Sequence, residues 1–475
     1  MARIKGTCTG TYGSRYNLYL DYTLNSQSVT NNTSNITLRQ WARASDSNYR
    51  AYNLNPINPY AIKINGVTKV SGKKVMDFRN MAVVELGSWR GNISHNADGK
   101  KTISISSNFS ILNVSSLTGG SVGPYSWTLP TIPRMSKPTL SSASFDLGSS
   151  ITIYTNRASS SFTHTIRYSF GGASGTIATG VGTSVSWTPP LSLANRIPNA
   201  ASGSGYIYCD TYSGGTKIGT ESVKFTGKVP SSIVPSFDTI THSEYVTDVA
   251  DKVGAYVQSK SRLDLAITGQ AGSYGSTIKG YSITFDGKSY SSRTVTSSVI
   301  EGSGDLTITG KITDSRGRTC TKSVTVNVLP YSVPKITKFT LQRCDSNGTP
   351  NVIGEYVKVT CMGSVSSLVN VTEKNNLTYR IKSKERGAVN WITKKSTTIS
   401  GLSLVGSDIL GTYAAVTSFD FHLEIVDKFY TTIAVNVLPT GKVTMRWGKD
   451  GVGIGKVREQ RVLDVLGEIY GNAGG

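Results

Sequence analysis

The sequence VNVLP occupies residues 326–330 and returns at residues 435–439. In each copy valine alternates with asparagine, the two-residue period of a β-strand with one buried face. The proline that follows lacks the backbone N–H group that a strand ladder needs, so the strand should end there. The repeat predicts two copies of one β-rich unit, each closing with its last strand. A second match, between Gly254-Ala255-Tyr256-Val257 and Gly354-Glu355-Tyr356-Val357, predicts equivalent strands in the two copies.

A Leu-Pro or Val-Pro pair marks the end of such a unit four times along the chain. The pairs are Leu129-Pro130, Val229-Pro230, Leu329-Pro330 and Leu438-Pro439. They are spaced 100, 100 and 109 residues apart, which suits one β-sandwich domain per interval. We therefore predict five parts: a jelly-roll-like β-sandwich over residues 1–130, Ig-like β-sandwiches over 131–230, 231–330 and 331–440, and a glycine-rich C-terminal module over 441–475.

Composition favours the same fold class. The 475 residues include 49 Gly and 24 Tyr but only 6 Met, and 17% are charged, a balance that suits short strands and tight turns better than long helices. The predicted fold is all-β, with serial Ig-like β-sandwich domains and a short glycine-rich C-terminal oligomerisation module.

Local patterns predict individual elements. Residues 162–170 alternate apolar and polar side chains and predict a half-buried strand. Asp-Gly type turns at 96–100 and 314–317 predict two hairpins. Apolar residues at helical spacing between Tyr245 and Val253 predict one or two helical turns.

The chain carries 50 Lys and Arg against 29 Asp and Glu, a net charge of +21. This charge attracts polyanions such as nucleic acid, teichoic acid or an acidic neighbouring subunit, and it does not choose among them. The five cysteines contain no CxxC pair, so we expect buried free thiols. Whether Cys344 and Cys361 meet across strands stays open.

The sequence gives little support for catalysis. The four histidines are scattered and lack metal-binding spacing. Residues 119–123 read GGSVG, but the predicted Gly/Ser loop has no following helix to form a nucleophile elbow. The glycines of 448–455 open no helix and precede no Lys-Ser or Lys-Thr pair, which disfavours nucleotide binding. We expect no enzyme, no catalytic or metal-binding residue and no cofactor.

The sequence gives more support for a binding function than for catalysis. The stretch WARASDSNYRAYNLNPINPY at residues 41–60 combines aromatic rings with polar neighbours, and we interpret it as a loop that could stack against sugar rings. The alternative is that its aromatic residues belong to the first core. The candidate contact residues are Trp41, Tyr49, Tyr52, Tyr60, Arg43 and Arg50.

Two further stretches are candidates for assembly. Arg380, Lys382 and Lys384 alternate with Tyr379 and Ile381, and so predict a strand whose basic face meets either solvent or an acidic partner. Beyond residue 440, glycine at every second position suits close approach of several chains. The candidate oligomerisation residues are Gly451, Gly453, Gly455, Leu463, Val465 and Ile469.

Several strings together resemble the minor structural proteins of long-tailed phages (siphophages) of Gram-positive bacteria. They are HNADGKKTISIS (95–106), LPTIPR (129–134), FTHTIRYSFGGASGTIATGVGTSVSW (162–187), YGSTIKGYSI (274–283), DSRGRT (314–319) and LPYSVPKI (329–336). The ending GVGIGKV…VLDVLGEIY (451–470) is similar to short trimerising modules of tail fibres.

This resemblance implies a structural component of a phage tail tip, baseplate or fibre that contributes to host-surface attachment and is located in the virion. Residues 1–6 lead into polar sequence without a hydrophobic signal region, so we expect synthesis in the host cytoplasm. The partners that the resemblance implies are other phage tail proteins and a host cell-wall glycan or teichoic acid, with no nucleic acid and no membrane insertion, and the chain is expected to form a homo-oligomer, as a trimer. A bacterial cell-surface adhesin is the second interpretation, and a cell-wall polysaccharide hydrolase is the third.

Overall fold

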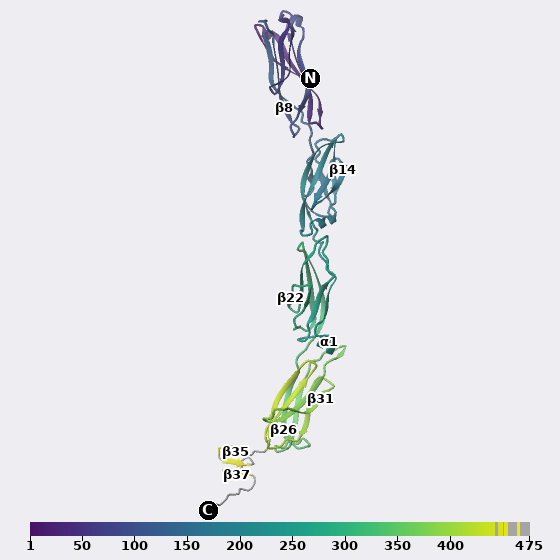
Figure 1. Ribbon diagram of the computed structural model, residues 1–475, viewed down its shortest axis with the longest axis vertical. Helices are drawn as coiled ribbons and strands as arrows, with labels where there is room; N and C mark the ends of the chain where they lie inside the picture. Colours follow the sequence, from purple (N-terminus) through teal and green to yellow (C-terminus); the bar gives the residue numbers. More distant parts are fainter. Residues whose placement is uncertain (442–444, 450, 455–462, 466–475) are drawn as a thin grey trace, which may run out of the picture. The chain divides into compact units, whose positions relative to one another are not determined.

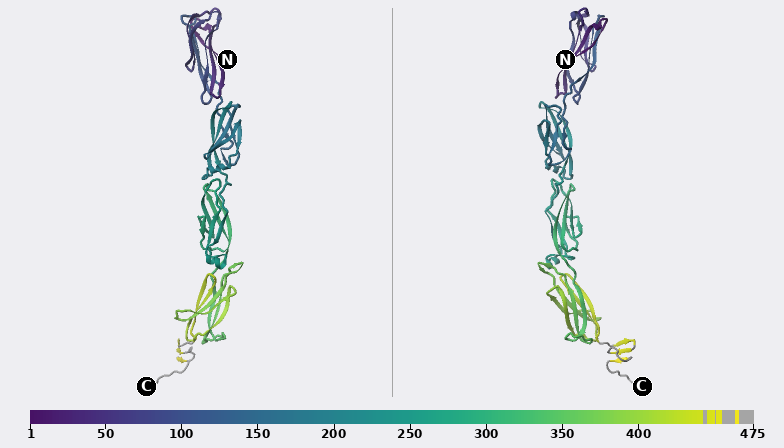
Figure 2. Two further views of the ribbon diagram at one scale, coloured as in Figure 1. Left: turned by 45° about the vertical axis from the view of Figure 1, so that its right-hand side comes forward. Right: turned by 180° about the vertical axis from the view of Figure 1, so that it is seen from behind.

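The computed structural model describes residues 1–441, 445–449, 451–454 and 463–465. The regular secondary structure of this part of the chain is almost wholly β-strand (Figures 1 and 2). The helical elements within it are short: η1 (Gly13–Arg15), η2 (Arg79–Met81), η3 (Leu191–Arg196) and α1 (Thr247–Val253).

The chain divides into two compact units, residues 1–233 and 234–475. Each unit contains two successive pairs of packed sheets. The all-β fold of serial Ig-like β-sandwiches is therefore confirmed. The five-part division with boundaries at 130, 230, 330 and 440 stays a prediction.

The first sandwich packs a four-stranded sheet against a five-stranded sheet, all antiparallel. The four-stranded sheet has the order β1 (Ala2–Lys5), β3 (Tyr16–Ser28), β4 (Thr33–Ala44), β7 (Val84–Ser94). The five-stranded sheet has the order β2 (Thr7–Thr9), β9 (Gly119–Leu129), β8 (Lys101–Ser110), β5 (Tyr52–Ile64), β6 (Val67–Asp77). Alternate residues of both sheets, such as Leu18, Ile36, Ile62 and Ile103, form one buried core.

The second sandwich pairs a three-stranded with a five-stranded sheet. The smaller sheet has the order β10 (Thr139–Leu140), β12 (Ile151–Tyr154), β15 (Ser184–Trp187). The larger has the order β11 (Ser144–Asp146), β17 (Thr216–Lys228), β16 (Ser202–Ser213), β13 (Phe162–Phe170), β14 (Ala173–Val181), with β11 parallel to β17. Trp187 of the smaller sheet meets Phe225 of the larger edge-on at 5.9 Å, so aromatic rings fill the space between the two layers.

The third sandwich repeats this topology. Its smaller sheet has the order β18 (Thr239–Glu244), β20 (Leu263–Thr268), β23 (Thr294–Thr296). Its larger sheet has the order β19 (Tyr256–Val257), β25 (Thr319–Leu329), β24 (Gly304–Asp314), β21 (Ile278–Phe285), β22 (Lys288–Tyr290), again with a parallel pair, β19 and β25. Strands β16 and β24 therefore hold the same place in their sheets.

The fourth sandwich keeps the central strands of this plan. One sheet has the order β26 (Lys335–Cys344), β27 (Tyr356–Ser364), β32 (Ser403–Gly411). The other has the order β31 (Ile392–Ile399), β30 (Leu377–Glu385), β33 (Phe419–Val426), β34 (Thr431–Leu438). A two-stranded ribbon, β28 (Val369–Asn370) with β29 (Thr372–Glu373), lies outside both sheets. The VNVLP copies end β25 and β34, as predicted.

Several local predictions are confirmed and others are wrong. The strand at 162–170, the hairpin around 314–317 and the short helix after Tyr245 are all present. The turn at 96–100 does not form a hairpin, because β7 pairs with β4 while β8 pairs with β5 and β9. That turn carries the chain from one sheet to the other.

The second wrong prediction concerns the likeness between Gly254-Ala255-Tyr256-Val257 and Gly354-Glu355-Tyr356-Val357. The first stretch becomes β19, a two-residue edge strand that is parallel to β25. The second opens β27, a nine-residue strand that is antiparallel to β26 and β32 in the opposite layer. The two similar sequences therefore form strands in different layers of their sandwiches, so this match does not mark structurally equivalent positions.

Candidate functional site

The predicted aromatic loop over 41–60 is largely strand. Residues 41–44 complete β4 and residues 52–60 lie in β5, so only 45–51 connect strands. Residues 41–44 pair with β3 in one sheet and residues 52–60 pair with β6 in the other, and this pairing overrides the loop-like composition. The loop prediction is wrong in that respect, while the contact role of its residues stays a prediction.

Trp41 points away from the core but is covered by neighbouring side chains. Its Nε1 donates to Asp21 at 2.8 Å, its ring lies 4.7 Å from that of Tyr19, and the guanidinium of Arg3 sits 4.7 Å from its centre. Burial raises the pKa of Asp21, but hydrogen bonds from Arg3 and Trp41 outweigh it and hold that pKa below its ordinary value. With 8% of the residue exposed, a sugar ring could reach Trp41 only if Arg3 moved.

The other predicted contact residues lie in separate surroundings. Tyr49 is half-buried against Tyr16, and Tyr60 is half-buried against the first core. Tyr52 is 48% exposed, with the guanidinium of Arg79 at 4.4 Å from its ring. Arg43 and Arg50 are exposed. The structure thus offers Tyr52, Arg43 and Arg50 to solvent and does not assemble the six residues into one stacking platform.

The basic strand predicted around 380–384 is β30. Arg380 and Lys382 both face Glu424 on β33, at 3.5 and 2.5 Å. Burial raises the pKa of Glu424, but the hydrogen bonds and charges of Lys382 and Arg380 together outweigh burial, so the pKa lies below the ordinary value. Lys384 bonds the carbonyl of Ala388. Two of the three cations therefore meet an acidic residue of their own sandwich.

Two buried histidines, His95 and His164, stabilise the fold through hydrogen bonds. His95 joins Ser34 and the carbonyl of Gly99 at 2.6 and 2.7 Å, and His164 joins Ser136 and the carbonyl of Val181, each at 2.8 Å. The GGSVG sequence lies inside β9, a strand, and not in the loop that the sequence predicted. The strand-turn-helix geometry that positions a nucleophilic serine is therefore missing from these residues.

The described ranges hold neither a metal-binding cluster nor a long apolar helix. No cluster of three or more His, Cys, Asp or Glu side chains there has the geometry to hold a metal ion. Across the same ranges, no helix has the length and hydropathy needed to cross a bilayer.

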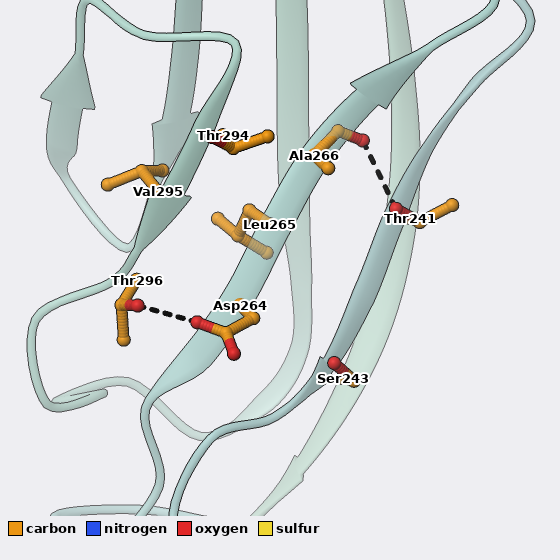
Figure 3. A pocket seen from close by; sticks show the side chains of 8 residues that line it. All are labelled: Thr241, Ser243, Asp264, Leu265, Ala266, Thr294, Val295 and Thr296. Atoms are coloured by element: carbon orange, nitrogen blue, oxygen red, sulfur yellow. Dashed lines mark hydrogen bonds between the residues drawn. The ribbon is translucent and has the colours of Figure 1, made fainter.

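A shallow trough of about 510 Å³ lies on the outer face of the smaller sheet of the third sandwich (Figure 3). Small side chains on β18, β20 and β23 leave this space open, and Thr296 donates to Asp264 at 2.5 Å. Asp264 is the one titratable side chain among the eight that line the trough. The trough can accept hydroxyl groups, but it offers no second carboxyl for the paired acid–base chemistry of glycoside cleavage.

A row of tyrosines on β16 was not singled out from the sequence. Tyr206, Tyr208 and Tyr212 alternate with the buried Ile207, Cys209 and Thr211, so the rings lie on the outer face of the five-stranded sheet. The signal was present in the sequence as tyrosine at a period of two within GYIYCDTYSGG. The rings of Tyr206 and Tyr208 are 6.3 Å apart and tilted by 33°.

Asp210 anchors the charged groups around these rings. It accepts from Arg167 at 2.7 and 3.0 Å, from Lys217 at 2.8 Å and from Thr220 at 2.6 Å. The hydrogen bond from Arg167 is the largest cause that holds the pKa of Asp210 well below its usual range, and Lys217 and Thr220 add to it. The carboxylate is 3% exposed, so the two cations face outward around a buried anion.

The candidate oligomerisation residues are only partly described. Gly451 and Gly453 lie in β36 (Gly451–Ile454), which pairs with β35 (Met445–Gly448) and β37 (Leu463–Val465). Leu463 and Val465 are the ends of β37. Gly455 and Ile469 lie outside the described residues.

Comparison with solved structures gives distant likenesses. The Ca²⁺-stabilised, ice-binding adhesin of an Antarctic bacterium is 11% identical with a TM-score of 0.30, over 90% of this chain and 98% of that one. Three N-terminal domains of the highly immunogenic outer capsid protein of bacteriophage RB49 are 12% identical with a TM-score of 0.24, over 64% and 96%. A titin fragment is 10% identical with a TM-score of 0.24, over 65% and 94%. These values are too low to say anything about function.

Sequence comparison is more specific. No curated protein matches the sequence. A family model, described as siphovirus protein of unknown function (DUF859), matches residues 11–474, nearly the whole chain. The chain belongs to this family of siphovirus proteins.

Proposed function

We propose that this chain is a structural component of a phage tail, at the tip, baseplate or fibre, and that it contributes to attachment of the particle to the host surface. One observation carries the proposal: serial β-sandwiches bury their own cores and leave their outer sheet faces free, in a chain of siphovirus origin. Such faces suit contacts with neighbouring proteins and with a surface.

Attachment through weak contacts becomes effective when several copies act together, because linked sites raise the effective concentration. The net charge of +21 favours an anionic host-wall glycan or teichoic acid, or an acidic neighbouring tail protein, as partner. Residues 441–475 are proposed to hold three copies together.

The tail location is tested on purified virions of the phage that encodes the chain. Mass spectrometry should detect the chain in the particle, and gold-labelled antibodies against the first sandwich should mark the tail. The capsid provides the internal control, since it should stay unlabelled. A chain that is produced during infection but is missing from purified particles would end the tail proposal.

The trimer is tested by light scattering. The full chain should have three times the mass of one copy, and deletion of residues 441–475 should return the mass of one copy. A circular dichroism spectrum retained by the shortened chain would show that its sandwiches are still folded. An unchanged number of copies after the deletion would contradict the assignment of oligomerisation to this segment.

A further inference from the structure

The fold does not require the tyrosines on β16, because the equivalent strand of the third sandwich lacks them. Strand β24 holds the same place in the third sandwich, and its outer face carries mainly threonine: Asp305, Thr307, Thr309, Lys311 and Thr313. On β16 the outer positions hold Tyr206, Tyr208, Asp210 and Tyr212. Threonine and tyrosine both suit strands, so the aromatic rings add something other than strand stability.

The rings are accessible. Tyr206 is 43% exposed, and Tyr208 and Tyr212 are half-buried. Ring centres 6.3 Å apart on successive outward positions make a slightly tilted platform of the kind on which flat, partly apolar rings can stack. The hydroxyl groups at the edges of the rings remain available for hydrogen bonds.

Cations border the platform on both sides. Arg167 of β13 stands opposite Tyr208, with its guanidinium 5.3 Å from the ring, and Lys224 of β17 stands opposite Tyr206. Lys217 stands opposite Tyr212. Two acidic residues lie on β13, β16 and β17: Asp210 on the outer face, and Glu221, which pairs with the inward-facing Cys209. Three cations therefore face one anion on the outer face, which keeps an excess of positive charge.

Arg167 and Lys217 keep N–H donors that Asp210 does not use. A guanidinium has five N–H donors and an ammonium has three. The Arg167 and Lys217 side chains are still 41% and 44% exposed. Asp210 therefore orients the two cations beside the rings and leaves further donors for an anion from solution.

We propose that the outer face of β13, β16 and β17 binds a phosphate-bearing glycan of the host cell wall, with sugar rings on Tyr206, Tyr208 and Tyr212 and phosphate groups beside Arg167, Lys217 and Lys224. The inference rests on the proposed attachment function and names its surface. Alternating sugar and phosphate groups match a row of rings flanked by cations, because each kind of group finds its own partner along the strand.

The experiment measures binding of the full chain to purified host-wall sacculi at low and at physiological salt. The test variant replaces Tyr206, Tyr208 and Tyr212 together by threonine, the residue type that β24 tolerates in the same place. The control is Tyr154→Thr, on β12 in the smaller sheet of the same sandwich, because Tyr154 is also 43% exposed. Circular dichroism and thermal melting of all three proteins confirm that they fold.

The triple variant should bind the sacculi about tenfold more weakly or worse, since loss of several stacked rings removes at least about 1.4 kcal/mol. Tyr154→Thr should bind like the unmodified chain. Treatment of the sacculi with hydrofluoric acid, which removes phosphodiester-linked polymers, should abolish binding by the unmodified chain. Higher salt should weaken binding, because exposed charges are screened.

Each contrary result has a distinct meaning. A folded triple variant that binds like the unmodified chain overturns this surface and leaves the proposed attachment function standing. Binding that survives hydrofluoric acid overturns the phosphate-bearing ligand, and equal displacement by a single-stranded oligonucleotide overturns its assignment as a glycan. An unmodified chain that binds no sacculi at either salt concentration overturns both this inference and the attachment role, but not the location in the tail.

Discussion

The guanidinium of Arg343 donates from Nε to the backbone oxygen of Pro439, 2.9 Å away and 96 residues later. The contact joins β26, the first strand of the fourth sandwich, to the residue that follows its last strand, β34. The whole residue is 7% exposed, and burial lowers the pKa of its guanidinium. The same side chain also donates to the carbonyls of Gly354, Tyr413, Ala414 and Thr417.

Replacement of Arg343 by methionine should destabilise the fourth sandwich by about 3 kcal/mol, because buried carbonyls lose their donors. Hydrogen exchange of the full chain should accelerate in peptides from β26 and β34. Arg386→Met, at an exposed position of the same sandwich, is the control and should change nothing there. Unchanged protection in Arg343→Met would contradict the role given to the guanidinium.

His164 is fully buried and ties β13 to β14 and to the segment that precedes β10. His164→Leu keeps much of the side-chain volume but leaves Ser136 and the carbonyl of Val181 without their bonds, so we expect a loss of about 2 kcal/mol. Thermal melting would measure it. Thr163→Val, one position along and exposed, should leave the melting temperature nearly unchanged, and an equal effect of both substitutions would refute this account.

The period of two was enough to predict some strands. It placed β13 correctly because Phe162, His164, Ile166 and Phe170 all turn inward. It could not predict which sheet a strand joins. The turn at 96–100 reverses the chain, but the sequence of a turn does not determine which strands pair with each other. The hairpin prediction failed for that reason.

The binding residues were harder to predict, because exposure depends on cross-strand neighbours. Trp41 faces outward, yet register places Tyr19 beside it and brings Arg3 over its ring. Neither neighbour is close to Trp41 in sequence. The tyrosines of β16 present the opposite case, because their regular spacing is visible in the sequence. Only comparison with β24 distinguishes them from ordinary strand residues.

Asp210 should make stability depend on pH. Its folded-state pKa lies below the ordinary value, so the ionised carboxyl stabilises the protein above the unfolded-state pKa of about 4, and this contribution is lost progressively as the pH falls below that value. Asp210→Asn should cost about 1–3 kcal/mol at pH 7 by weakening buried charged hydrogen bonds. Calorimetry should show the difference narrowing from about pH 4 toward pH 2.

Asp146→Asn is the matched control for this experiment, because Asp146 is an exposed aspartate of the same larger sheet. Its melting curve should follow that of the unmodified chain through the same pH series. A constant difference between Asp210→Asn and the unmodified chain at every pH would show that ionisation of Asp210 does not contribute to stability.

The five cysteines should all remain free thiols. Cys344 pairs with Tyr356 and Cys361 with Phe339, which sets the two cysteines five residues apart along the ladder of β26 and β27. At about 3.3 Å per residue that offset is roughly 17 Å, well beyond the reach of about 7 Å between the Cα atoms of a disulfide. Intact mass should therefore be the same before and after reduction, and a gain of two hydrogens on reduction would contradict the register.

Thiol labelling at pH 8 should show slow reaction of the buried cysteines in the folded chain. Burial raises the pKa of Cys209 and Cys361 to about 11, so both should react slowly in the folded chain, because the thiolate is the reactive form. In denaturant all five cysteines should react. Ser222→Cys, at an exposed position on β17 of the same sheet as Cys209, provides a thiol that should label rapidly in the folded protein. If Cys209 reacted as fast as this control, the inner face of β16 would be open to solvent, and the alternation that turns its tyrosines outward would be wrong.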